Sequence, residues 1–231
     1  MNAPAPARTP AIRLHHCPQT RSMRTLWLIR ELGLEAEVIT HPFDRALRDP
    51  AYLALSPAGR VPALELDGET LFETGAITEL LCERFSPDGL GRGPGHPERG
   101  AFLVWIHFAE TLSQHVAALT QQHVMLYEDA MRSPVVMRLE AKRLAKCYEA
   151  IEARLRETGC DSLLAGGFSA ADISVGQAVY MGQYFVTLDG YPRSAAWYAA
   201  ISARPGFQAA LPAPGEGIYD RAFYPPWEAT P

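Results

Sequence analysis

The chain has 231 residues, of which 48% are hydrophobic and 20% are charged, and its formal net charge is −5 at pH 7. This mixture is typical of a globular protein, and the length suffices for two modest domains that bury their cores without disulfides. The negative charge argues against a nucleic acid or an anionic membrane surface as the partner.

The cysteines and the N-terminal segment indicate a reducing compartment. The four cysteines lie far apart and form neither a C-x-x-C pair nor a zinc-ligand spacing: Cys17, Cys82, Cys147 and Cys160. We therefore expect reduced thiols and no metal site. The opening segment MNAPAPARTP lacks the apolar stretch of a secretory signal, and no later apolar run reaches membrane-spanning length. We expect a cytoplasmic protein.

Residues 11–86 predict a domain that mixes strands and helices. A strand over residues 12–16 leads through a loop into an apolar helix that ends at Gly33, and a second strand covers residues 37–40. A short helix follows near residues 51–55. Two strands, 62–66 and 70–72, flank Asp67-Gly68, a dipeptide suited to a tight hairpin turn, and a helix begins near Thr74. The predicted order is β-α-β-α-β-β-α.

The second half of the chain predicts helices alone. The stretch SPDGLGRGPGHP has four glycines and three prolines in twelve residues, so we predict an interdomain linker over residues 87–97. Long helical patterns then fill residues 98–211. They cover roughly 98–127, 135–158, 170–182, 194–203 and 207–211.

Residues 212–231 form a tail rich in proline and aromatic residues. It contains Tyr219, Phe223, Tyr224 and Trp227, which are too many rings for a fully solvated segment. We predict that the tail packs back on the protein, near the mouth of a pocket, in an extended rather than helical form.

Four segments in register resemble cytosolic glutathione transferases: LHHCPQTRSMRTLWLIRELGL, SPAGRVPALELDG, LFETGAITELL and FSAADISVGQA. The resemblance covers about residues 11–211 and points to bacterial-type, serine/threonine-like classes. It implies an α/β thioredoxin-like N-terminal domain that binds glutathione, an all-α C-terminal helical domain that shapes an apolar pocket, and a homodimer. The implied activity is attack of the glutathione thiolate on a small electrophile or a peroxide.

The resemblance assigns the glutathione site to two short motifs. In Arg60-Val61-Pro62 the family's proline is cis, and the backbone of the residue resembling Val61 pairs with the cysteinyl part of glutathione. The alternative is a proline that merely begins an edge strand. In Glu73-Thr74, the hydroxyl and amide of Thr74 would hold the γ-glutamyl carboxylate at a helix N-terminus, with Glu73 facing the α-amino group. A simple helix cap is the alternative there.

The loop after the first strand offers three candidates for the group beside the ligand sulfur. Thr20 aligns best with the serine of serine-type classes, and Ser22 lies two residues beyond it. Cys17 followed by Pro18 suggests a thiol-disulfide reductase instead, although no resolving cysteine follows. Tyrosine-type chemistry is disfavoured because histidines occupy the end of the strand.

Two further features have structural or open roles. Ser169 and Asp172 in FSAAD have the spacing of a capping box, which resembles the family's folding motif in a buried helix. Arg45 and Arg48 could reach the glycine carboxylate of glutathione, although a solvated loop is the simpler reading. A non-catalytic glutathione-binding or interaction protein of the same fold stays open as an alternative function.

Overall fold

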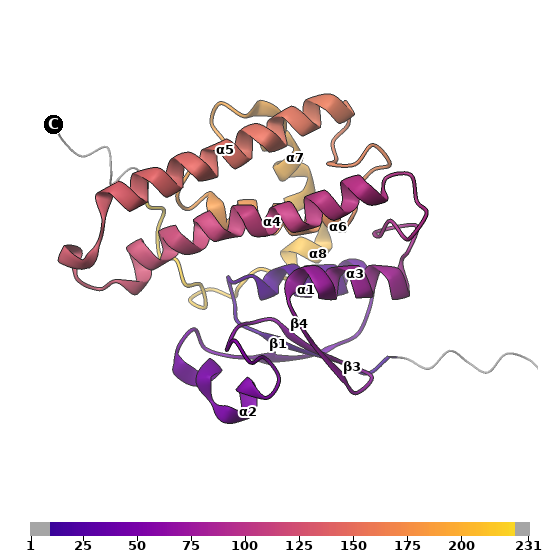
Figure 1. Cartoon of the computed structure of the whole chain (residues 1–231), viewed down its shortest axis with the longest axis horizontal. Coiled ribbons are helices and arrows are strands. Elements are labelled where there is room, and N and C mark those ends of the chain that lie inside the picture. Colours follow the sequence, from indigo (N-terminus) through magenta and orange to yellow (C-terminus); the bar gives the residue numbers. More distant parts are fainter. Residues whose placement is uncertain (1–9, 225–231) are drawn as a thin grey trace, which may run out of the picture.

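The computed structural model describes residues 10–224. Its N-terminal part contains a four-stranded sheet with the strand order β2-β1-β3-β4. The elements are β1 (Ile12–His16), α1 (Ser22–Glu31), β2 (Glu37–Thr40), η1 (Arg45–Arg48), α2 (Pro50–Leu53), β3 (Ala63–Leu66), β4 (Glu69–Phe72) and α3 (Thr74–Phe85). Helices α1 and α3 pack together between the sheet and the rest of the molecule, and α2 lies on the other side (Figure 1). The predicted element order is confirmed.

The sheet is mixed, and local chemistry explains its hairpin. Strand β1 pairs in parallel with β2 and antiparallel with β3, which pairs antiparallel with β4. The turn between β3 and β4 places Asp67 at φ 52° and Gly68 at φ 92°. A tight two-residue turn needs positive φ at both central positions, which aspartate tolerates and glycine adopts freely. The predicted hairpin is therefore confirmed.

The C-terminal part is helical. Its elements are α4 (Arg99–Thr120), η2 (Gln121–Met125), η3 (Asp129–Met131), α5 (Pro134–Thr158), α6 (Ala170–Gly182), α7 (Pro192–Ser202) and α8 (Pro205–Gln208). The predicted helix over 98–127 ends earlier, because after Thr120 the chain widens into a π-turn in which the Leu126 amide donates to the Gln121 carbonyl. Helix α6 is the central element of this part, packing on α1, α4 and α7.

The capping box predicted for α6 is present. The Ser169 hydroxyl accepts from the Ala171 amide at 3.2 Å, and the Asp172 carboxylate accepts from the Ser169 amide at 2.9 Å. Asp172 also accepts from the Trp197 indole at 2.9 Å. This carboxylate thus starts α6 and ties α7 to it.

The segment between α3 and α4 is packed rather than loose. The buried Arg92 side chain donates to the carbonyls of Gly89 at 2.6 Å and Gly91 at 2.8 Å, and pairs with Glu98 at 3.1 Å. The change from mixed sheet to helices falls within this segment. Glycine and proline prevent helix here, while Arg92 satisfies the carbonyls that the turns leave free.

The described part of the tail packs on the protein, as predicted. Tyr219 and Phe223 are buried, whereas Tyr224 is 42% exposed. The Phe223 amide donates to the Tyr184 carbonyl at 2.6 Å. Trp227 lies outside the described residues. Across residues 10–224, no helix combines the length and the apolar character that crossing a membrane requires.

Candidate functional site

The strand register brings three predicted segments to one edge of the sheet. His15 near the end of β1 pairs with Ala63 at the start of β3, and Ala63 pairs with Phe72 at the end of β4. The loop after β1, the Val-Pro pair before β3 and the Glu-Thr pair after β4 therefore lie at the same edge. α1 and α3 both begin there, so their positive N-terminal ends face this edge together.

Thr20 lies in the loop between β1 and α1 and retains a little exposed surface. Its side-chain oxygen donates to the Cys17 carbonyl at 2.8 Å and lies 2.9 Å from the Ser22 hydroxyl oxygen. Its carbonyl accepts from the Gln177 amide on α6 at 3.2 Å. The residue is 8% exposed, so it is buried but less completely than its neighbour Ser22.

Ser22 is the first residue of α1 and is completely buried. Its hydroxyl oxygen accepts from the Cys17 amide at 3.0 Å and lies 2.8 Å from Nδ1 of His16. Burial lowers the pKa of His16 to about 4, so its ring is neutral at pH 7. The Ser22 side chain is thus surrounded by protein groups, and its hydrogen bonds stabilise the loop between β1 and α1.

Cys17 is buried, and its environment makes the thiol unreactive. Its side chain is 1% exposed, and burial raises the pKa of its thiol to about 11. The thiolate is the reactive form of cysteine, so a buried thiol that stays protonated is a poor nucleophile. This environment does not favour the thiol-disulfide alternative.

The peptide bond between Val61 and Pro62 is cis, as the resemblance implied. The preceding carbonyl, of Arg60, accepts from the Tyr52 hydroxyl at 2.7 Å and from the Ser56 hydroxyl at 2.8 Å. The Arg60 residue is exposed and Val61 is half-buried. Tyr52 and Ser56 therefore hold the backbone that presents Val61, a role that no sequence motif indicated.

Thr74 is the first residue of α3 rather than its cap, which is Glu73. Its side-chain oxygen donates to Glu110 at 2.8 Å and accepts from Arg24 at 3.1 Å. Glu73 is exposed and has φ +76°, an unusual backbone conformation for a residue with a side chain. The Thr74 hydroxyl is engaged by the protein, which leaves the first-turn amides of α3 to face the edge.

Arg24 connects the two halves of the molecule. Its guanidinium is 1% exposed and contacts Thr74, Glu110, Ser113 and Gln177. Burial raises the pKa of Glu110, but the adjacent Arg24 and Arg21 outweigh it, so the pKa lies below its ordinary value and the carboxylate is ionised. In the sequence, the feature that could have indicated this role of Arg24 is its position three residues before Trp27, on the apolar face of α1.

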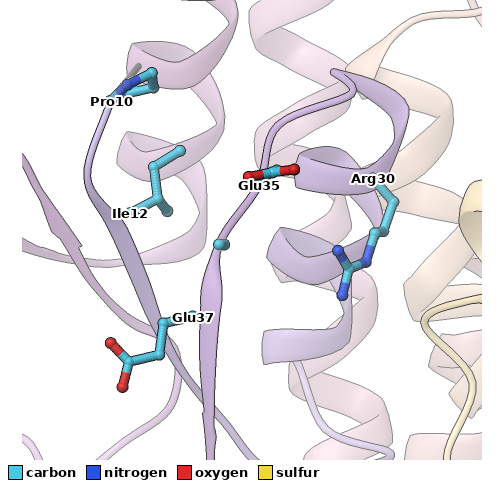
Figure 2. A pocket seen from close by; sticks show the side chains of 6 residues that line it. Pro10, Ile12, Arg30, Glu35 and Glu37 are labelled. Atoms are coloured by element: carbon cyan, nitrogen blue, oxygen red, sulfur yellow. The ribbon is translucent and has the colours of Figure 1, made fainter. Parts of the chain in front are cut away.

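A hollow of about 460 Å³ lies at the opposite end of the parallel strand pair (Figure 2). It is lined by Pro10, Ile12, Arg30, Glu35, Ala36 and Glu37. These residues belong to the beginnings of β1 and β2 and the end of α1, whereas the predicted site residues follow the end of β1. The hollow is therefore separate from the candidate site.

The fold and this edge define a class: a thioredoxin-like domain with a cis-proline before β3, joined to an all-helical domain. Residues 16–84 match the family model described as the glutathione S-transferase N-terminal domain. Glutathione S-transferase 4 of Zea mays is 30% identical over 208 residues, which cover 85% of this chain and 90% of that protein. The chain belongs to the glutathione S-transferase family.

Solved structures agree with this assignment. Glutathione transferase F7 from Populus trichocarpa has a TM-score of 0.76 at 26% identity, covering 87% of this chain and 97% of that one. A glutathione transferase from Phanerochaete chrysosporium, crystallised with oxidized glutathione, has a TM-score of 0.78 at 19% identity, with coverage of 89% and 95%. The second likeness concerns the fold alone.

Proposed function

We propose that the protein binds glutathione at the shared sheet edge and ionises the glutathione thiol beside Thr20. The resulting thiolate attacks a small electrophile, to which glutathione is transferred. The observation that carries this proposal is the convergence of the Thr20 loop, the cis Val61-Pro62 pair and the N-terminus of α3. One structure of the same fold was crystallised with oxidized glutathione. Glutathione is the co-substrate that this family membership implies.

The binding step uses backbone groups and charge. The N–H and C=O of Val61 pair with the cysteinyl part of glutathione, as two neighbouring strands pair. The hydrogen bonds to the Arg60 carbonyl keep the backbone at Val61 in place for this pairing. The first-turn amides of α3, with the buried Arg24 behind them, attract the γ-glutamyl carboxylate. Glu73 faces the α-amino group, and the exposed Arg60 adds positive charge at the rim.

The chemical step depends on the hydroxyl of Thr20. When the ligand sulfur arrives, this hydroxyl turns from the Cys17 carbonyl and donates to sulfur, while the Ser22 hydroxyl supports it at 2.9 Å. Hydrogen bonding to the charged form lowers the thiol pKa, and the N-terminus of α1 acts in the same direction. The released proton goes to solvent. The thiolate then forms a carbon–sulfur bond as the leaving group departs with its electron pair.

A homodimer and a cytoplasmic location are part of the same proposal. The family pairs the first domain of each chain with the second domain of the other. Phe72 on the edge strand β4 is 44% exposed and Val104 on α4 is 62% exposed, which gives each domain an apolar contact residue. Sedimentation equilibrium tests the pairing, because a Val104→Glu variant should shift the protein toward monomer.

Two measurements test the function. Glutathione at about a hundred times its dissociation constant should stabilise the fold by roughly 2.7 kcal/mol in a thermal titration. Conjugation to an activated aryl halide should follow the thiolate fraction with pH. No thermal shift at millimolar glutathione would sink the proposal, and a shift without turnover of any electrophile or peroxide would assign the non-catalytic binding role.

A further inference from the structure

Gln19, the residue before Thr20, has an unusual backbone and a buried side chain. Its φ is +53°, in the left-handed region that residues with a Cβ seldom adopt. The side chain is a neutral amide with 2% exposure. Something must therefore hold the residue in this conformation and satisfy its polar atoms.

Three groups do so. Its Nε2 donates to the Tyr184 hydroxyl at 2.8 Å and to the Tyr180 hydroxyl at 3.1 Å. Its Oε1 accepts from the backbone amide of Tyr219 at 2.8 Å. Both amide hydrogens and the carbonyl oxygen are thus used. The first two partners come from α6 and the turn after it, and the third comes from the tail, 200 residues away in sequence.

The tail is itself anchored beyond this contact. The Tyr219 hydroxyl oxygen lies 2.6 Å from that of Thr120, at the end of α4. Phe223 stacks on Phe185 and on His123, with ring centroids 5.4 Å and 5.0 Å away. On the Gln19 side the fit is close, because a Cβ added to Gly217 would lie 2.8 Å from Oε1 of Gln19.

We propose that Gln19 is a positioning residue for Thr20, and that residues 217–219 of the tail, which contact the Gln19 side chain, tune the ionisation of bound glutathione through it. This inference rests on the proposed function. The backbone angles of Gln19 orient the peptide that leads into Thr20. On the other side of Thr20, its own carbonyl accepts a hydrogen bond from the Gln177 side chain at 3.2 Å. Loss of the side-chain anchors lets Gln19 return to negative φ, which turns the Thr20 hydroxyl away from the sulfur.

The decisive readout is the pKa of the glutathione thiol in the complex, followed by the ultraviolet absorbance of the thiolate across pH. Gln19→Met keeps the length of the side chain and removes its hydrogen bonds. We expect this pKa to rise by about one unit, which lowers the thiolate fraction about tenfold below the pKa. Gln19→Gly also loses the anchors, but glycine adopts positive φ freely. Its pKa should shift less than that of Gln19→Met, although its melting temperature falls at least as far.

Matched variants on the tail separate positioning from general loosening. Gly217→Ala presses on Oε1 of Gln19 and should raise the thiol pKa. Phe223→Leu loosens the other anchor of the tail, and should lower the melting temperature while leaving the thiol pKa unchanged. An unmoved pKa in Gln19→Met, an equal shift in Phe223→Leu, or a larger shift in Gln19→Gly than in Gln19→Met would each overturn the inference.

A thermal titration with glutathione distinguishes failure of the role of Gln19 from failure of the proposed function. When the unmodified protein binds glutathione and lowers its thiol pKa, an unchanged pKa in Gln19→Met overturns only the role of Gln19. When the unmodified protein does not bind glutathione, the proposed function fails and takes this inference with it.

Discussion

The hydroxyl oxygens of Thr20 and Ser22 lie 2.9 Å apart, and Ser22 is the deeper of the two, with no exposed surface. The two side chains that the sequence left as alternatives therefore suit different roles. Thr20, at 8% exposure, fits the proposed thiolate donor better than the fully buried Ser22, which contacts Thr20 and lies 2.8 Å from His16. Chains of hydrogen bonds polarise one another, so the neutral His16 ring can strengthen the outermost donor.

The first prediction concerns this donor. Thr20→Ala should raise the pKa that governs turnover by about 1–2 units, because the thiolate loses a hydrogen bond to its charged form. Glutathione affinity should change only a few-fold, since the proposed binding contacts lie at Val61 and Thr74. The measurement is the pH dependence of kcat/KM. Thr20→Ser is the matched control and should keep the native profile, and an unmoved profile in Thr20→Ala would exclude Thr20 as the thiolate donor.

The second prediction concerns Cys17. Cys17→Ala should leave the pH profile of turnover almost unchanged, because burial raises the pKa of this thiol to about 11 and keeps it protonated. The lost sulfur should cost about 1 kcal/mol of stability through a small cavity. Alkylation by iodoacetamide should be slower at Cys17 than at the half-buried Cys160. Abolished activity in Cys17→Ala would restore the thiol-disulfide hypothesis.

The third prediction concerns Thr74. Thr74→Val keeps the volume and the α3 amide but removes the hydroxyl that bridges Arg24 and Glu110. The free energy of unfolding should fall by about 1–3 kcal/mol, because buried charged groups lose a hydrogen-bond partner.

The control for Thr74 lies one turn later in the same helix. Thr78 is 1% exposed, and its hydroxyl oxygen has no hydrogen-bond partner within residues 10–224. Thr78→Val should be neutral or stabilising in chemical denaturation. Equal losses in the two variants would show that the Thr74 contacts are unimportant. KM for glutathione should rise only a few-fold in Thr74→Val, since the amide remains.

The fourth prediction concerns pH. Burial lowers the pKa of His16 and of His123 to about 4, with Arg132 and Arg221 adding to the shift at His123. The unfolded chain has ordinary histidines with a pKa of about 6.5, so between these values the unfolded state binds more protons. The stability that the two neutral histidines contribute is therefore complete above pH 6.5 and is lost as the pH drops toward 4.

Thermal melts from pH 7 to pH 5 test whether stability falls with decreasing pH. His123→Phe removes one titrating site and keeps a ring against Phe185 and Phe223, so the melting temperature should fall less steeply with acid. An identical slope in the variant and the unmodified protein would contradict the assignment of the pH dependence to His123.

Local chemistry in the sequence determined several elements of this protein. The Asp67-Gly68 turn and the Ser169–Asp172 capping box each depend on residues within a few positions of one another, whereas the cis bond before Pro62 was implied only by the family resemblance. Apolar periodicity likewise determined the order of strands and helices, because each element must bury one face. A short motif carries its own geometry and is therefore visible before folding.

Only the tertiary structure decided which polar side chains meet. The Thr74 hydroxyl is used by Arg24 and Glu110, which lie 50 and 36 residues away, and Gln19 is held by a tail amide 200 residues away. The packing of the loop and α1 buries Ser22 completely, whereas Thr20 keeps 8% of its surface exposed. Such contacts depend on how helices pack and where the chain returns, and a buried hydrogen bond between distant residues leaves no periodic or local trace in a sequence.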